Sequence, residues 1–425
     1  MQALYTETDN PLVQGIKVIG IGKHGSKPLS KELITSIYTY LAEGEGVPIQ
    51  KGTFYGALMA KGPTEEEKVL LYASGGDKSI PVAEHLYQLL CSDAPAELKE
   101  IGLKLLDKEF LSIGEAEKLG QFMYSDEPGE AFRGMAASML RIRYETDEEY
   151  QGLLNAAEAT YADQYRARPA GTRPAVVVQL AEPFDGVEHS YLITPLLAQF
   201  FQQAGYPAVV TMGRSGGPKL ALNTLDLYQD MGCSFIENAG ELAQTPPAFG
   251  WALDQQLLSV ALDKWVDRRR LFFKRPFLAT LEKVLNPLQA QVLVVSVFHL
   301  TYIEKMITLA AMAGFKGVMV MKRGLEGTLA PSIAKASGIT CALIKADGTF
   351  ITQSFEATQE EFTPFRADSD DVVEALHLQD NVALVRQFAA KGATTNQDFD
   401  KRVNLAFALY QKGLSWIEEN MAYTR

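Results

Sequence analysis

The chain has 425 residues, of which 47% are hydrophobic, and its 40 basic and 52 acidic residues give a formal net charge of −12. This length predicts two domains or one elaborated domain. The acidic balance disfavours general nucleic-acid binding, although a local basic face is compatible with it. No apolar run is as long as a membrane span, the first residues lack a signal-peptide pattern, and three scattered cysteines suit a reducing cytoplasm and exclude a clustered zinc site. We therefore expect a cytoplasmic protein.

The first part of the chain predicts helices that recur. Residues 29–71 have helical periodicity behind Ser30, a residue type that caps helix N-termini. Residues 111–153 repeat this pattern without gaps, and the shift pairs Ser30 with Ser112, Gly52 with Gly134 and Thr64 with Thr146. We interpret the two stretches as an internal duplication of a helical hairpin, with a chance match of two amphipathic helix pairs as the alternative. Such hairpins commonly bury one face against a partner, so we expect a homodimer through the N-terminal helices.

Residues 161–174 interrupt all periodicity with Arg, Pro and Gly, which indicates a linker. We place the domain boundary there. The sequence then predicts a helical domain over residues 1–172 and an α/β domain over residues 173–425.

Residues 174–213 open the second domain with a strand–loop–helix–strand unit. The mostly apolar run 176–180 is typical of a strand buried on both faces, 207–212 is predicted as a second buried strand, and the helix between them is predicted over 191–204. This unit favours a parallel sheet with a right-handed crossover. Ligands in such sheets bind beyond the carboxyl ends of the strands, so the polar loop 181–190 is the first candidate for a site.

Two later segments could hold anions. Gly213 to Lys219 has three glycines with a Ser, an Arg and a Lys after a strand, which fits either an anion-binding nest or a mobile turn before a helix at 225–231. Residues 267–276 are the densest basic stretch and are interleaved with aromatic residues. They fit either a phosphate-binding or acid-binding site, or a solvated helix end.

The rest of the chain completes the sheet. Strands are predicted at 292–298 and 317–321, a helix at 302–313, and an antiparallel hairpin at 341–346 and 350–355. A Gly-rich turn with Glu326 follows the second of these strands and is a second candidate ligand edge. Closing helices are predicted at 372–390 and 399–420.

Three segments together carry a family resemblance. The tract from Arg269 to Pro287 fits the pattern R-x-x-L-G-x-R-T … L-x-N-P, Met212-Gly213 falls on a K-H-G-N turn, and Lys322 to Gly324 falls on a V-H-G turn. From about Leu111 to the C-terminus the chain resembles the anthranilate phosphoribosyltransferase family, also called glycosyltransferase family 3. The resemblance implies a helical N-terminal domain before a mostly parallel α/β domain of the nucleoside phosphorylase and phosphoribosyltransferase type.

The resemblance also implies a site, from which this sequence departs. Family members bind phosphoribosyl pyrophosphate on a G-T-G-G-D-G loop, of which only Asp185 and Gly186 are kept here, and of the following N-I-S-T only Thr194 is kept. The acidic pair that binds magnesium in the family aligns near residues 327–330, where no acid occurs. Arg275 stands where the family contacts its acidic aromatic substrate.

We therefore expect a glycosyltransferase family 3 protein with an altered donor site and weak or absent standard activity. The alternative is a non-catalytic homodimer that binds nucleic acid or a metabolite. We name no catalytic residue, no metal ligand and no certain cofactor, and magnesium is expected only if pentosyl transfer survives. The expected ligand is a small anionic or phosphorylated molecule, bound by Asp185, Gly186, His189, Thr194, Gly213, Lys219, Arg269 and Arg275.

Overall fold

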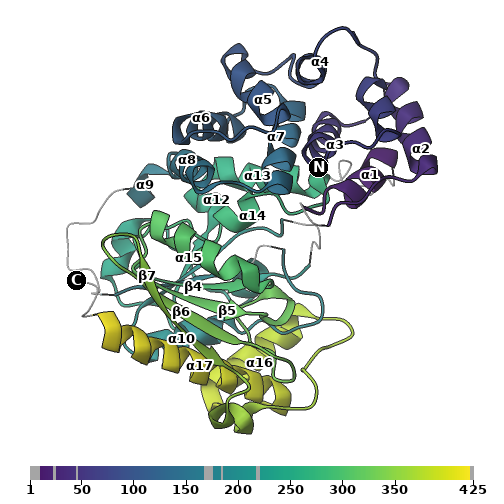
Figure 1. Cartoon of the computed structure of the whole chain (residues 1–425). Helices are drawn as coiled ribbons and strands as arrows, with labels where there is room; N and C mark the ends of the chain where they lie inside the picture. Colours follow the sequence, from purple (N-terminus) through teal and green to yellow (C-terminus); the bar gives the residue numbers. More distant parts are fainter. Residues whose placement is uncertain are drawn as a thin grey trace. The chain divides into compact units, whose positions relative to one another are not determined.

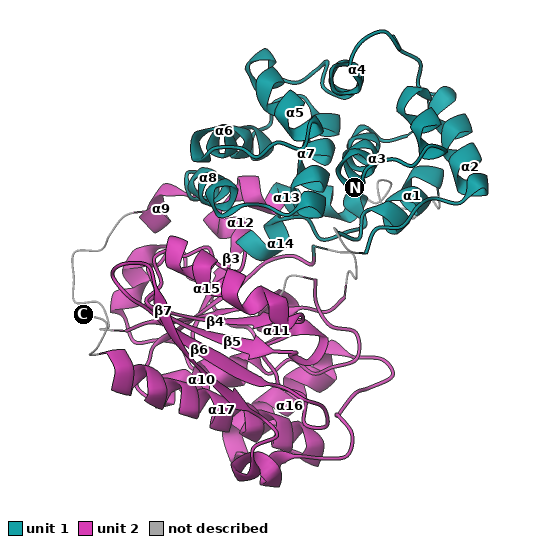
Figure 2. Cartoon of the chain, in the orientation of Figure 1, with its two compact units in different colours: residues 1–160, 216–218, 264–281 teal, residues 161–215, 219–263, 282–425 magenta. Residues whose placement is uncertain are grey.

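The computed structural model describes residues 10–22, 25–44, 46–166, 176–182, 185–216 and 221–421. The chain divides into two compact units, coloured separately in Figure 2. The first unit comprises residues 1–160, 216–218 and 264–281, and the second comprises residues 161–215, 219–263 and 282–425. Each unit is described by itself below. Among the described residues, no helix combines the length and apolar character that crossing a bilayer requires.

The first unit is built from helices (Figure 1). Their N-termini follow the capping residues of the sequence, since the side chains of Asn10, Ser30, Ser112 and Thr146 each accept a backbone N–H of the helix that they precede. The segments are α1 (Pro11–Ile19), α2 (Lys31–Ala42), α3 (Pro48–Lys61), η1 (Glu67–Tyr72), α4 (Val82–Leu90), η2 (Ala96–Leu98), α5 (Lys99–Leu106), α6 (Ile113–Met123), α7 (Glu130–Arg143), α8 (Asp147–Glu158), α14 (Leu278–Leu281) and the part of α13 (Val260–Phe272) from Lys264 onward.

The second unit contains a seven-stranded sheet of order β3-β2-β1-β4-β5-β6-β7. Strands β1 to β5 pair in parallel, and β6 and β7 are added antiparallel at one side. The strands are β1 (Val178–Ala181), β2 (Ala208–Met212), β3 (Trp251–Asp254), β4 (Val292–Val297), β5 (Gly317–Lys322), β6 (Gly338–Ile344) and β7 (Phe350–Glu356). The predicted fold class, helices followed by a mostly parallel α/β sheet, is confirmed.

Helices cover this sheet (Figure 1). Residues of α10, α11, α16 and α17 form one apolar core with alternate residues of the strands, such as Val178 and Leu180 of β1. The helical segments of the unit are α9 (Asp163–Arg166), α10 (Thr194–Gln203), α11 (Thr224–Asp230), η3 (Ala239–Ala243), α12 (Gln255–Leu258), η4 (Leu300–Tyr302), α15 (Ile303–Met312), η5 (Leu325–Gly327), η6 (Glu360–Phe365), α16 (Leu378–Lys391) and α17 (Gln397–Met421).

Two elements of this unit differ from the sequence-based prediction. Strand β3 was not predicted, because its four residues Trp251–Asp254 form no long apolar run and become a strand only by pairing with β2. The helix expected from residue 372 begins at Leu378 instead. In the preceding segment, the backbone N–H of Val373 donates to the carbonyl of His189, which ties that segment to the β1–α10 loop.

Candidate functional site

The carboxyl ends of the parallel strands bring two loops of the second unit together. One loop follows β1 and leads into α10, and the other follows β5 and contains η5. The structure describes the first loop at Glu182 and from Asp185 to Ile193, so Pro183 and Phe184 of the altered family motif lie outside the described residues. These two loops are the places where the sequence predicted that a ligand binds.

Gly186 fixes the course of the first loop. Its φ is +79°, and a Cβ at this position would stand 2.5 Å from the carbonyl oxygen of Ala221. The next residue, Val187, forms an antiparallel bridge with Leu222. Any side chain would therefore strain the backbone and also separate the loop from the segment before α11.

Glu326 of the second loop is bound by the donors of the first. Its carboxylate accepts the backbone N–H groups of Glu188 at 3.0 Å and His189 at 2.7 Å, and the Ser190 hydroxyl at 2.6 Å. Glu326 has φ +51°, an uncommon conformation for a residue with a side chain. An internal carboxylate thus occupies the group of donors that this loop presents.

A buried arginine interacts electrostatically with Glu326. Arg402 is fully buried and forms an ion pair with Asp371. Burial lowers the pKa of Arg402 to about 10, while the negative charges of Asp370 and Glu326 act in the opposite direction. The guanidinium therefore stays charged near neutral pH and attracts the Glu326 side chain.

Glu182 makes a reciprocal contact from the first loop to the second. The residue is 1% exposed, and its Oε1 accepts the backbone N–H of Leu329 at 3.0 Å. Its Oε2 is buried as well, and the hydroxyls of Thr194 and Thr224 lie near the carboxyl group. Burial raises the pKa of Glu182 to about 7, against the lowering effects of the Leu329 N–H, the Thr194 hydroxyl and the charge of Lys283. A carboxyl group that titrates near neutrality therefore lies directly after β1.

The predicted ligand residues of the second unit have structural partners. The carbonyl of Asp185 accepts the Ser215 hydroxyl at 3.4 Å, and that of Gly213 accepts the Asn223 amide at 2.8 Å. Nδ1 of His189 lies 3.0 Å from the carbonyl oxygen of Val373. Thr194 is 1% exposed in the first turn of α10. Lys219 lies outside the described residues.

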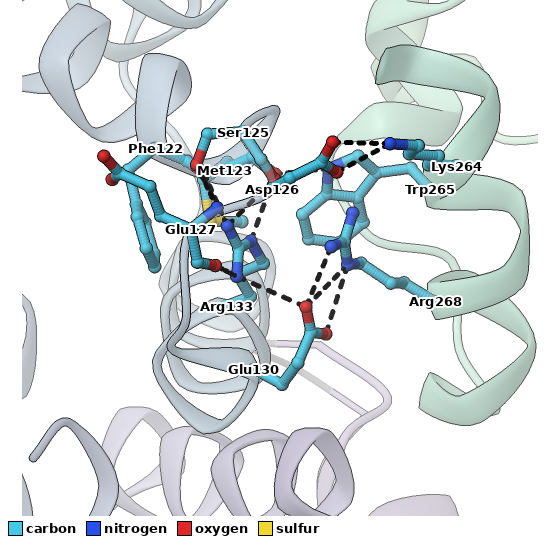
Figure 3. A network of polar contacts seen from close by, with 10 residues as sticks. All are labelled: Phe122, Met123, Ser125, Asp126, Glu127, Glu130, Arg133, Lys264, Trp265 and Arg268. Carbon is cyan, nitrogen blue, oxygen red and sulfur yellow. Dashed lines mark hydrogen bonds and ion pairs between the residues drawn. The ribbon is translucent and has the colours of Figure 1, made fainter. Parts of the chain in front are cut away.

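The basic tract, residues 267–276, belongs to the first unit, and internal contacts involve part of it and the neighbouring Lys264 (Figure 3). Arg268 donates to the carboxylate of Glu130 at 2.8 Å, and Lys264 to that of Asp126 at 2.6 Å. Arg269 is 1% exposed, and a Cβ on Gly216 would stand 2.7 Å from its guanidinium carbon. Arg268 and Arg269 thus lie mostly within the helical unit, whereas Lys264 pairs with Asp126 on its exposed surface.

Arg275 is exposed and lines a pocket that lies wholly within the first unit. The enclosed volume of this pocket is about 10 Å³, which is room for a single water molecule, so a larger ligand could only bind at its mouth. Arg141, Lys274 and the hydroxyl-bearing Ser138 share its wall with Arg275. Burial and the neighbouring charge of Lys17 lower the pKa of Lys274, as expected for a cation close to other cations. The sequence showed Arg275 but not the contribution of Arg141, which comes from α7.

The predicted ligand residues thus fall into two sets. Asp185, Gly186, His189, Thr194 and Gly213 lie in the second unit, and Arg269 and Arg275 lie in the first. Their convergence in one cleft stays a prediction. Among the described residues, no group of three or more His, Cys, Asp or Glu side chains is arranged to hold a metal ion.

Comparisons with known proteins support the fold that the sequence predicted. No family model matches the chain. An uncharacterized protein from Aquifex aeolicus (strain VF5) is 23% identical over 245 residues, which is 54% of this chain and 71% of that protein. Anthranilate phosphoribosyltransferase from Saccharomyces cerevisiae matches with a TM-score of 0.52 and 13% identity, over 74% of this chain and 88% of that one.

Two further solved structures carry the same name. A variant of the yeast enzyme with magnesium bound has a TM-score of 0.52 and 14% identity, over 76% of this chain and 90% of that one. The enzyme from Thermus thermophilus has a TM-score of 0.48 and 18% identity, over 76% of this chain and 98% of that one. At these identities the likeness to the yeast structures shows that this chain has a phosphoribosyltransferase-like fold.

Proposed function

We propose that the chain is a phosphoribosyltransferase-like protein that binds a small acidic ligand and has weak or no standard transfer from phosphoribosyl pyrophosphate. The observation that carries this proposal is the Glu326 carboxylate, which occupies the donors of the β1–α10 loop. A phosphorylated donor would need these same N–H and hydroxyl groups, because a phosphate is held by convergent hydrogen-bond donors.

Electrostatics supports the loss of donor binding. A pyrophosphate at this loop would have to displace Glu326 and approach the carboxyl group of Glu182, which carries a negative charge above its pKa of about 7. Like charges a few ångströms apart repel each other, and more strongly where water is excluded. Magnesium would offset part of this repulsion, but the aligned positions near residues 327–330 carry no acid to hold it.

The pocket of the first unit supports binding of a carboxylate. Arg275 can meet a carboxylate with two charge-assisted hydrogen bonds, and Arg141 and Lys274 add positive charge on the same wall. The yeast protein of the same fold is named for transfer to anthranilate, an acidic aromatic molecule. We therefore propose that a small carboxylate, such as that of an acidic aromatic molecule, binds to the exposed guanidinium of Arg275 at the mouth of this pocket.

A thermal-shift and calorimetric titration of the full chain tests the proposal. Anthranilate is expected to stabilise the wild-type protein, and Arg275→Ala is expected to weaken that binding about tenfold to a hundredfold, in line with loss of a charged hydrogen-bonded pair. Lys31→Gln is the matched control, because Lys31 is exposed and does not line the pocket.

Two outcomes would contradict the proposal. Robust magnesium-dependent consumption of phosphoribosyl pyrophosphate and anthranilate would show that the donor site works. Binding of single-stranded DNA that falls steeply with added salt, without any response to anthranilate, would favour the nucleic-acid alternative instead.

A further inference from the structure

The two helical repeats of the first unit use the same hydrogen bonds at equivalent positions. The backbone N–H of Leu29 donates to Glu67 at 2.8 Å, and that of Leu111 donates to Glu149 at 2.9 Å. Each of these acids is also held by a basic residue six positions earlier, Lys61 for Glu67 and Arg143 for Glu149. Each repeat thus has its own buried carboxylate that joins its beginning to its end.

The repeats also pack against each other through equivalent glycines. A Cβ on Gly52 in α3 would stand 1.8 Å from the carbonyl oxygen of Ala131, and a Cβ on Gly134 in α7 would stand 2.2 Å from that of Ile49. The shift that pairs Gly52 with Gly134 also pairs Ile49 with Ala131. Exchanging the two repeats therefore reproduces the contact.

A contact that is reproduced when its two sides are interchanged is characteristic of an isologous interface. In a symmetric homodimer, residue i of one copy contacts residue j of the other and the reverse contact occurs as well. Here both copies of the motif belong to one chain. Backbones that approach so closely require glycine on both sides, so the interface is specific to these helices and not a general apolar contact.

With the other helices packed around them, α3 and α7 have no solvent-exposed face over their central residues. Every residue from Gly52 to Leu58 in α3 and from Phe132 to Leu140 in α7 is buried. A run of that length passes round the whole circumference of a helix, since a helical turn takes about 3.6 residues. The central residues of both helices are thus enclosed.

We propose that the first repeat is a built-in partner of the second repeat. It occupies the surface of α7 to which the equivalent helix of a second copy of this chain would otherwise bind. The amphipathic repeat predicted a homodimer through the N-terminal helices. In this proposal, α3 and α7 pair with each other inside one chain and not between two chains. A dimer that used other surfaces would be compatible with it.

Sedimentation and amide hydrogen exchange on the full-length protein test this inference without a variant. We expect the amide exchange rates of residues 48–61 and 130–143 to be independent of protein concentration. If no other surface of the chain associates, sedimentation should give the mass of the monomer, 46.7 kDa. A dimer that leaves the exchange of α3 and α7 unchanged supports the proposal. If dimer formation slows amide exchange in either helix, the proposal is wrong. A dimer in which the two chains exchange their repeats would give this result.

Substitutions of the two glycines test the contact between α3 and α7 independently. Gly52→Ala and Gly134→Ala are expected to lower Tm by similar amounts, because each methyl group meets an equivalent carbonyl. Gly114→Ala is the matched control, since Gly114 is also helical and has nothing within 4 Å of its Cβ position. If Tm were unchanged in both Gly52→Ala and Gly134→Ala, the proposed glycine contact between the repeats would be wrong.

Discussion

The Ser190 hydroxyl donates to the carboxylate of Glu326 at 2.6 Å, across 136 residues of sequence. This contact and the two backbone donors beside it close the β1–α10 loop onto the loop after β5. An edge of the sheet at which the sequence predicted a ligand is thereby bound by an acid of the same chain.

Removal of that acid should reopen the donors. Wild-type protein is expected to show no thermal shift with inorganic pyrophosphate, whereas Glu326→Ala should be stabilised by it, because the Glu188 and His189 N–H groups and the Ser190 hydroxyl lose their acceptor. Glu361→Ala is the control, since it removes an exposed acid that pairs with Lys412. An equal response of the wild type and Glu326→Ala would show that Glu326 does not occupy an anion site.

The stability of the protein should depend on Glu182 between pH 4.5 and 7. Burial raises the folded pKa of this carboxyl from 4.5 to about 7, so the folded state binds more protons than the unfolded state in this interval. Stability contributed by Glu182 therefore falls as pH rises through the interval, by about 3 kcal/mol in total. Glu182→Gln, which keeps an acceptor for the Leu329 N–H, should flatten this dependence in urea unfolding at pH 5 and pH 8. An unchanged slope in the variant would refute the assignment.

Gly186 should tolerate no side chain. Gly186→Ala combines a positive φ with a 2.5 Å approach to the carbonyl of Ala221, so we expect a loss of stability of about 2–4 kcal/mol. Gly205→Ala separates the two effects, because Gly205 has φ +91° but nothing within 4 Å. We expect about 1 kcal/mol for that control in denaturant unfolding. Equal losses in the two variants would mean that contact with Ala221 does not matter.

Arg133 should be essential for the stability of the first unit (Figure 3). Its guanidinium is fully buried and donates to the backbone carbonyls of Phe122, Ser125 and Glu127. Arg133→Met keeps most of the volume but leaves these carbonyls without their donors, and we expect a loss of about 3 kcal/mol or more. Lys118→Met, which removes one exposed donor to the Glu97 carbonyl, should change stability by less than about 1 kcal/mol. A small effect of Arg133→Met in chemical unfolding would contradict the network.

Local pattern was sufficient to predict much of the fold. The apolar runs that became β1, β2, β4 and β5 could be recognised because strands buried on both faces have no polar alternation. Helix starts at Ser30 and Ser112 follow from a short-range hydrogen bond that any chain with this sequence can make. Strand β3 could not be predicted, because pairing with β2 stabilises it more than its own four residues do.

The candidate site depended on the tertiary structure. The sequence indicated the loop after β1 and the turn with Glu326 as separate ligand edges, and only the folded sheet brings that acid to the N–H of His189, 137 residues away. Likewise, Gly52 and Gly134 could be aligned as repeats, but their mutual contact requires two folded helices that cross. Short-range preferences are encoded within a few residues, whereas contacts between distant residues depend on how the whole core packs.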